Sequence, residues 1–333
     1  MERNEIASNL VVEYLKRFPS ASKHAIARKL KKDNPLVFGS LETIRYMIRY
    51  YTGSVGNKHK GKTPENKVKF NTAFSYDNPF GLPDSDERKW EPYVMPTAAN
   101  NILILSDVHM PYHNIKALTA AINYGKEQKV NAVILNGDVM DCYAISSFVK
   151  DPRARRFSEE IEMTRDFLKN IQKVLRAKLF FKLGNHEERW QRFLRVNAPA
   201  ICDMDEFRLK VILNCEILGV ELIEDKRIIK AGHLNIMHGH EFGKVSSAVN
   251  PARSYYLKTK QNVICGHLHQ ASEHTEPNLS GELATAFSTG CLCELHPEYA
   301  PINRWSHGFA HVHINKDGTF IVRNLRIING KIV

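Results

Sequence analysis

Seven side chains of the kinds that bind metal ions follow short apolar runs along the chain. The runs at residues 102–105, 132–135, 179–183, 234–237 and 263–265 each lead within a few positions to Asp, Asn or His. The seven candidate ligands are Asp107, His109, Asp138, Asn185, His238, His267 and His269. Imidazole nitrogens with carboxylate and amide oxygens suit Mn, Fe or Zn, and this set contains no thiolate. We expect two divalent transition metal ions, with manganese favoured, because a shared carboxylate holds two cations about 3.5–4 Å apart for phosphoryl chemistry.

The elements that must position these side chains alternate between apolar runs and amphipathic stretches. Helices are predicted over residues 115–126 and 159–176, between strands at 102–105, 132–135 and 179–183. This strand–helix–strand alternation indicates a sheet with helices outside it. Because side chains beyond the carboxyl ends of adjacent strands meet in one crevice, the candidate ligands should lie together.

Shorter apolar runs later in the chain predict a second, partly antiparallel sheet, and hence an α/β fold with two sheets. They lie at residues 211–213, 220–223, 227–229, 234–237, 263–265, 310–314 and 320–323. Gly137, Gly184 and Gly266 each precede a candidate ligand. We expect these glycines to let the backbone turn sharply off each strand.

Five motifs occur in a fixed order between residues 101 and 270. They are D-x-H at 107–109, GDxxD at 137–141, GNHE at 184–187, a single His at 238 and GHxH at 266–269. Together they resemble the calcineurin-like metallophosphoesterase family. The resemblance implies a two-sheet α/β/β/α sandwich and a metal-dependent phosphoester hydrolase.

The resemblance also implies how the ligands are divided between two ions. One ion would be held by Asp107, His109 and His269, and the second by Asn185, His238 and His267, with Asp138 bridging both. His240 is an alternative to His238, which we prefer because it stands directly at the end of its strand and at the family's position. A water shared by the ions would lose a proton near neutral pH and attack phosphorus in line.

Three further residues are candidates for the chemistry. His186 follows Asn185 directly, so its side chain points another way, and as an imidazolium it could protonate the departing alkoxide. Asp141 resembles the family's partner carboxylate that orients this histidine, and a structural capping role is the alternative. His113 is a candidate substrate contact or, alternatively, a cap for the helix that follows it.

The sequence departs from the protein phosphatases of this family at two places. Their GDxxD motif is followed by Arg-Gly, where this chain has Cys142-Tyr143, and their GNHE is preceded by Arg, where this chain has Leu183. Those arginines grip a phosphomonoester dianion. Basic residues crowd the loop after GDxxD instead, and a basic rim suits a substrate with several phosphates. The basic residues of this loop are Lys150, Arg153, Arg155 and Arg156.

Nearly all the excess positive charge of the chain lies near its start. Residues 1–70 contain 15 Lys and Arg against 6 Asp and Glu, which gives +9 of the total +11. Residues 1–53 are predicted to form three short helices, and the third would carry Arg45 and Arg49 on its polar face. This unit resembles a helix-turn-helix, so we expect nucleic acid to be a partner. The alternative is a small helical bundle, a protein-interaction module that docks on the enzyme or on a second subunit.

Two functions remain open from the sequence. The first is a nuclease, a phosphodiesterase that acts on nucleic acid positioned by the basic N-terminal unit. The second is a small-molecule or phosphoprotein phosphatase whose N-terminal unit is an interaction module. Residues 54–97 are rich in Pro, Gly and polar residues and are predicted to be a linker or a wrapping segment before a catalytic domain at 98–333.

The remaining composition favours a cytoplasmic protein. No apolar run is long enough to span a bilayer, and the first residues lack the apolar core of a signal peptide. The six cysteines form no CxxC pair, so we expect free thiols in a reducing compartment.

Overall fold

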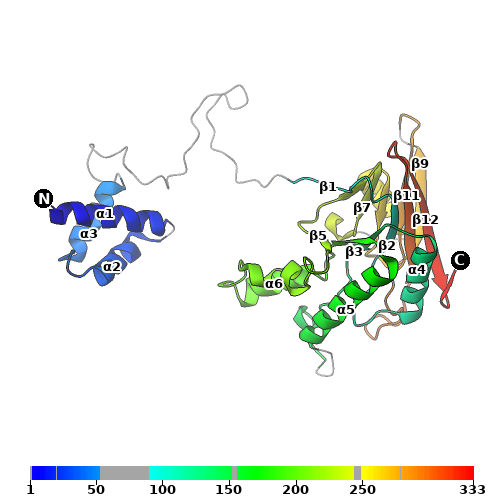
Figure 1. The fold of residues 1–333 in the computed structure, drawn as a ribbon, viewed down its shortest axis with the longest axis horizontal. Helices are drawn as coiled ribbons and strands as arrows, with labels where there is room; N and C mark the ends of the chain where they lie inside the picture. The colour runs from blue at the N-terminus through cyan, green and yellow to red at the C-terminus, as the bar shows by residue number, and fades with distance from the viewer. Residues whose placement is uncertain (1, 20, 53–89, 152–155, 244–248, 278) are drawn as a thin grey trace. The chain divides into compact units, whose positions relative to one another are not determined.

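The computed structural model describes residues 2–19, 21–52, 90–151, 156–243, 249–277 and 279–333 (Figure 1). The chain divides into two compact units, Met1–Lys89 and Trp90–Val333, and each is described by itself. No helix among the described residues is long and apolar enough to cross a membrane.

The first unit contains the three predicted helices, α1 (Glu2–Arg17), α2 (Lys23–Asp33) and α3 (Leu41–Tyr51). Ser22 and Ser40 begin α2 and α3 as N-caps, because each hydroxyl accepts a hydrogen bond from a backbone N–H in the first turn. The helices pack around one apolar core, whose fully buried members are Val11, Ala27, Leu30, Ile44 and Ile48. The expected helical boundary at residue 53 lies just outside the described residues.

A seven-stranded sheet forms the centre of the second unit, in the order β13-β12-β11-β2-β3-β4-β5. Strands β2 to β5 are parallel, and β11, β12 and β13 extend the sheet in antiparallel fashion. The bounds are β2 Asn101–Leu105, β3 Ala132–Asn136, β4 Lys178–Lys182, β5 Glu221–Ile223, β11 His307–Ile314, β12 Phe320–Ile328 and β13 Lys331–Ile332.

A six-stranded mixed sheet faces the first, in the order β1-β6-β7-β8-β10-β9. Its parallel pair β7–β8 carries two of the sequence motifs at its carboxyl end. The bounds are β1 Tyr93–Val94, β6 Ile229–Ala231, β7 Leu234–Met237, β8 Val263–Cys265, β9 Ser272–Pro277 and β10 Leu283–Ser288.

Helices cover the outer faces of the two sheets, so the unit is an α/β/β/α sandwich, as predicted. α4 (Ile115–Glu127) and α5 (Phe157–Leu175) pack on one face of the seven-stranded sheet, and α8 (Pro251–Thr259) packs on the six-stranded one. The remaining helices are α6 (Glu188–Asn197), α7 (Leu209–Ile212) and three single 3₁₀ turns at 143–145, 205–207 and 240–242.

Strand β2 is apolar on both faces because each face packs in a separate core. Leu103 and Leu105 belong to the core beneath α4 and α5, whereas Ile102 and Ile104 belong to the core between the two sheets. All four are fully buried. A strand covered on both faces has no polar side, so it appears in the sequence as a continuous apolar run.

Four apolar runs were predicted wrongly. Residues 211–213 lie in or next to α7 rather than in a strand, and the runs at 220–223, 310–314 and 320–323 belong to the first sheet rather than the second. Strand β1 lies within the segment 54–97 that was predicted to be a linker or a wrapping segment, and it pairs with β6 of the second sheet.

One buried ion pair joins the two sheets. The Nζ atom of Lys182, at the end of β4, lies 2.8 Å from Oε1 of Glu241, and both side chains are almost fully buried. Glu241 accepts hydrogen bonds from the backbone N–H groups of His238 and Gly239, so the pair fixes the turn that follows β7. Although burial disfavours the charged carboxylate, Lys182 lowers the pKa of Glu241 to about 2.

We expect Lys182→Met to lower the free energy of unfolding by about 3–5 kcal/mol, because it leaves the Glu241 carboxylate buried without its counter-charge. Chemical denaturation at neutral pH measures this change. Lys178→Met, at the exposed start of β4, is the matched control. Since the pKa of Glu241 is depressed from 4.5, the pair's contribution should be complete above pH 4.5 and should disappear as the pH falls through 2. An unfolding free energy within 1 kcal/mol of the parent would contradict this account.

Candidate metal centre

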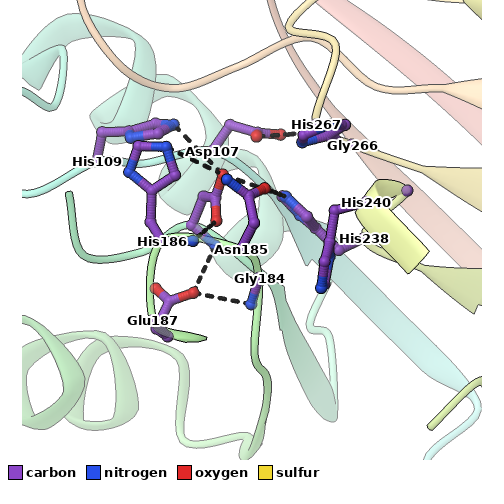
Figure 2. Close-up of polar contacts among 12 residues, drawn as sticks. Asp107, His109, Gly184, Asn185, His186, Glu187, His238, His240, Gly266 and His267 are labelled. Atoms are coloured by element: carbon purple, nitrogen blue, oxygen red, sulfur yellow. Dashed lines mark hydrogen bonds and ion pairs between the residues drawn. The ribbon is translucent and has the colours of Figure 1, made fainter. Parts of the chain in front are cut away.

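The predicted ligands come together at the carboxyl ends of five strands, as expected. Strands β2, β3 and β4 are neighbours in one sheet, and β7 and β8 are neighbours in the other. Because each set is parallel, its strand ends meet at the same edge. Figure 2 shows the side chains from both sheets facing one another across this edge.

The carboxylates of Asp107 and Asp138 are the negative centre of the cluster. Both residues are buried, with at most 1% of their surface exposed. The Asp107 carboxylate accepts the backbone N–H of His267, and its Oδ1 lies 3.1 Å from Nε2 of His269. The Asp138 carboxylate accepts the backbone N–H of His186, and its Oδ2 lies 3.2 Å from Nε2 of His238.

Two imidazoles are held by their Nδ1 atoms, so that Nε2 faces the carboxylates. Nδ1 of His109 lies 2.9 Å from a carboxylate oxygen of Asp141, and Nδ1 of His238 lies 2.8 Å from the backbone carbonyl of Asn136. A metal-binding histidine is commonly fixed in this way by a partner on its other nitrogen. Nε2 of His238 also lies 3.2 Å from Oδ1 of Asn185, which brings this amide oxygen into the cluster.

The electrostatics of the cluster favour a positive charge between the carboxylates. Burial alone would lower the pKa of His238 and His269, but Asp138 and Asp107 outweigh it and raise each pKa to about 10. Burial and the nearby His238 lower the pKa of His267 to about 4, so this ring is a neutral donor. The donor atoms of Asp138, His238 and His267 lie within 4.8 Å of one another, close enough to share one cation.

The geometry favours His238 over His240 within this cluster. His238 belongs to the three-donor group with Asp138 and His267, whereas Nε2 of His240 lies 3.0 Å from the carboxylate of Glu188. The His240 ring is therefore engaged with α6.

His186 lies at the edge of the cluster, where a ring nitrogen is within 4.8 Å of donor atoms of His109 and Asp138. Its other contacts differ in part from the prediction. Its Nδ1 is 2.7 Å from the backbone carbonyl of Asp141 and 3.4 Å from the carboxylate of the same residue. The Asp141 carboxylate is closer to His109, so it orients His109 and its carbonyl holds His186. Burial lowers the pKa of His186, but Asp138 and Asp141 outweigh it, so the pKa of this ring is raised from its usual value.

The structure describes two of the four predicted substrate contacts, Arg156 and His113. Arg153 and Arg155 lie outside the described residues, and Arg156 is exposed, with its guanidinium 3.2 Å from Glu159. His113 pairs with the backbone of Cys293, and the cap of α4 is Asn114 rather than His113.

The two arginines predicted to bind nucleic acid already have a surface partner. Arg45 and Arg49 of α3 form ion pairs of 3.3 and 3.1 Å with Glu42 of the same helix. Exposed pairs of this kind contribute about 0–1 kcal/mol, so a phosphate can displace them at small cost.

Two residues of the site carried no role in the sequence analysis. Glu187 is buried and accepts the backbone N–H groups of Asp138, Met140 and Gly184, so it joins the GDxxD and GNHE turns. Its position in the GNHE motif was the feature of the sequence that could have identified Glu187. Arg189 donates to the carbonyl of Asp141 at 2.8 Å and lies 3.0 Å from Nε2 of His186, and no sequence pattern singled it out.

The backbone of the site is unusual in its dihedral angles. The cluster residues with a left-handed backbone are Asp107, His109, Asp138, His267 and His269, with φ between 51° and 69°. Non-glycine residues in this region cost about 1–3 kcal/mol each and gather at functional sites.

The glycines before the candidate ligands were predicted to let the backbone turn sharply. Of the three, only Gly137 has a positive φ, at +84°, so only there does the turn itself require glycine. Gly184 has an ordinary φ, but a Cβ atom there would collide with the Asp138 carboxylate and its backbone nitrogen. Close approach, rather than a sharp turn, is therefore what requires glycine at 184.

Fold and site together define a metal-dependent phosphoesterase. The family model of the calcineurin-like phosphoesterases matches residues 101–271, and the chain belongs to that family.

Similar proteins and solved structures match parts of the chain. The gene 54 protein of Mycobacterium phage L5 is 26% identical over 179 residues, which cover 52% of this chain and 70% of the relative. A dimetal phosphatase of Danio rerio covers 68% of this chain and 96% of its own, at 13% identity and a TM-score of 0.37. A Vps29 mutant of Entamoeba histolytica covers 70% and 96%, at 15% identity and a TM-score of 0.36.

We expect Gly184→Ala to weaken divalent metal binding by about 10–100-fold, because the added Cβ displaces the Asp138 carboxylate. Metal titration of the purified chain, followed by metal analysis after dialysis, measures this. Gly39→Ala is the control, since nothing lies within 4 Å of a Cβ at that position. Unchanged metal affinity in Gly184→Ala would show that Asp138 tolerates displacement.

Proposed function

We propose that this chain is a two-metal phosphodiesterase that cleaves nucleic acid. The supporting observation is the cluster in which two buried carboxylates face imidazole Nε2 atoms from both sheets, those of His238 and His269 from one and that of His109 from the other. In the proposed arrangement Asp107, His109 and His269 would hold one ion. Asn185, His238 and His267 would hold the other, and Asp138 would be shared. When bound, the two ions would supply Lewis acidity and an activated water for in-line attack at phosphorus.

The remaining chemistry belongs to the side chains around the cluster. His186 Nε2 is the candidate proton donor to the departing oxygen, because its Nδ1 donates to the Asp141 carbonyl and leaves Nε2 facing the centre. In this structure Nε2 accepts from the Arg189 guanidinium at 3.0 Å. Movement of this guanidinium to a phosphate oxygen of the substrate would free Nε2 to carry the proton.

A row of arginines on α6 supports a substrate with several phosphates. Arg189, Arg192 and Arg195 follow one another at three-residue spacing, starting at His186, and α6 projects from the margin of the sheet unit (Figure 1). No carboxylate of the described residues lies within 4.0 Å of these guanidinium groups. Phe193 on the same helix is partly exposed and stacks on Trp190, which offers a surface for a base.

The alternative is a small-molecule or phosphoprotein phosphatase whose N-terminal unit binds protein. One observation favours it. Arg189 places a guanidinium beside His186 at the centre, and an arginine there suits a phosphomonoester dianion. Substrate preference separates the two functions.

The central experiment presents the Mn²⁺-loaded full chain with a labelled oligonucleotide, a chromogenic phosphodiester and a chromogenic monoester. We expect cleavage of the oligonucleotide and the diester. Asp138→Asn controls for contaminating nuclease and should abolish both activities while lowering the bound metal. Hydrolysis of the monoester alone would favour the phosphatase alternative.

The α6 row makes a prediction of its own. Arg192→Ala with Arg195→Ala should raise KM for the oligonucleotide and reduce the salt dependence of binding by about one unit of log–log slope per arginine. The chromogenic diester should be hydrolysed as before, since it is too short to reach these residues. Lys169→Ala with Lys173→Ala removes the same charge from the exposed face of α5 and should change neither substrate. If the two double variants change oligonucleotide binding equally, the α6 arginines act through net charge and not through their position.

His186→Ala should keep its metal content and lose turnover by about 10²–10⁴-fold on substrates with poor leaving groups. The loss should be much smaller for p-nitrophenyl esters, whose leaving group needs no proton. Comparison of kcat for a p-nitrophenyl and an alkyl diester measures the difference. Equal losses on both would instead make His186 a ground-state binding residue.

A further inference from the structure

Cys293 is buried beside the metal centre and had no place in the expected ligand set. It lies in the loop after β10, and 3% of its surface is exposed. Its Sγ is 3.9 Å from Nδ1 of His269. The sulfur, His109 and His269 each offer a donor atom within 4.8 Å of the other two.

The loop that carries Cys293 is fixed to the elements of the site. The backbone N–H of Leu292 donates to the carbonyl of Asp107 at 3.0 Å, and the N–H of Asn114 donates to the carbonyl of Leu292 at 2.8 Å. The backbone of Cys293 also forms a bridge with His113. The sulfur is therefore held against the cluster by the strand β2 turn itself.

The two nitrogens of His269 face different groups. Nε2 lies 3.1 Å from Oδ1 of Asp107 and 3.2 Å from Nε2 of His109, inside the cluster. Nδ1 faces the sulfur of Cys293. The equivalent Nδ1 atoms of His109 and His238 meet oxygens, of Asp141 and Asn136, so His269 alone among these three rings depends on a sulfur.

We propose that Cys293 is a positioning residue of the metal centre, whose sulfur accepts the Nδ1–H of His269 and so directs Nε2 of that ring toward the cation. The inference rests on the proposed assignment of His269 as a ligand. Sulfur is a weak acceptor, so it fixes the tautomer while adding less basicity to the ring than a carboxylate does. The indole of Trp305, 4.2 Å from the His269 ring, limits how far the ring can turn.

The test measures metal binding rather than turnover. Co²⁺ titration of the full chain should give two bound ions, and Cys293→Ala should weaken one of them by about 10–100-fold while the other is unchanged. Cys293→Ser, which retains an acceptor, should recover much of the loss. Cys202→Ala removes a thiol elsewhere and serves as the control. The melting temperature of the metal-free variants shows that each one folds.

The same titration distinguishes the ways in which the proposal can fail. If Cys293→Ala binds two ions as tightly as the parent, Cys293 does not position His269, and the proposed function stands. A strong sulfur-to-cobalt charge-transfer band that disappears in Cys293→Ala would make the thiolate a direct ligand and overturn the positioning role. A parent chain that binds no cation overturns the proposed function and this inference with it.

Discussion

The burial of two carboxylates at neighbouring strand ends is the constraint on which the rest of the site depends. Asp107 and Asp138 are removed from water, and a buried charge is costly unless opposite charge and hydrogen-bond donors surround it. Backbone N–H groups of His267 and His186 meet the two carboxylates, and imidazole nitrogens supply the remaining contacts. Glu187 in turn holds the turn that carries Asp138. These contacts are needed because two like charges lie close together inside the protein.

The central strands could be predicted because their burial leaves a simple pattern. Strands such as β2 and β3 are covered on both faces, so their apolar runs stand out between amphipathic helices. The run at 211–213 was ambiguous, because three apolar residues fit a helical turn as well as a strand, and it forms part of α7. Strand β9 alternates exposed and half-buried residues and contains no apolar run, so the sequence offered no signal for it.

The clustering of the candidate ligands could be predicted for a different reason. Each one lies within a few residues of a strand end, so a local motif records its position. Their supporting contacts come from distant parts of the chain and leave no such record. The carbonyl of Asn136 holds a ring 102 residues away, and the sulfur of Cys293 faces a ring 24 residues away. Asp141 shows the limit within a motif, because spacing alone could not tell that its carboxylate faces His109 and its carbonyl faces His186.

The left-handed backbone of the cluster has a consequence for how this protein can change. Five site residues adopt φ values that glycine would accept without strain, and each costs about 1–3 kcal/mol, against a typical net stability of about 5–15 kcal/mol. Glycine at Asp107 or Asp138 would relieve this strain, but it would also leave the facing imidazole of His269 or His238 without its buried counter-charge. Relief of backbone strain and loss of these ion pairs therefore oppose each other, so the strained backbone persists where the carboxylate is needed.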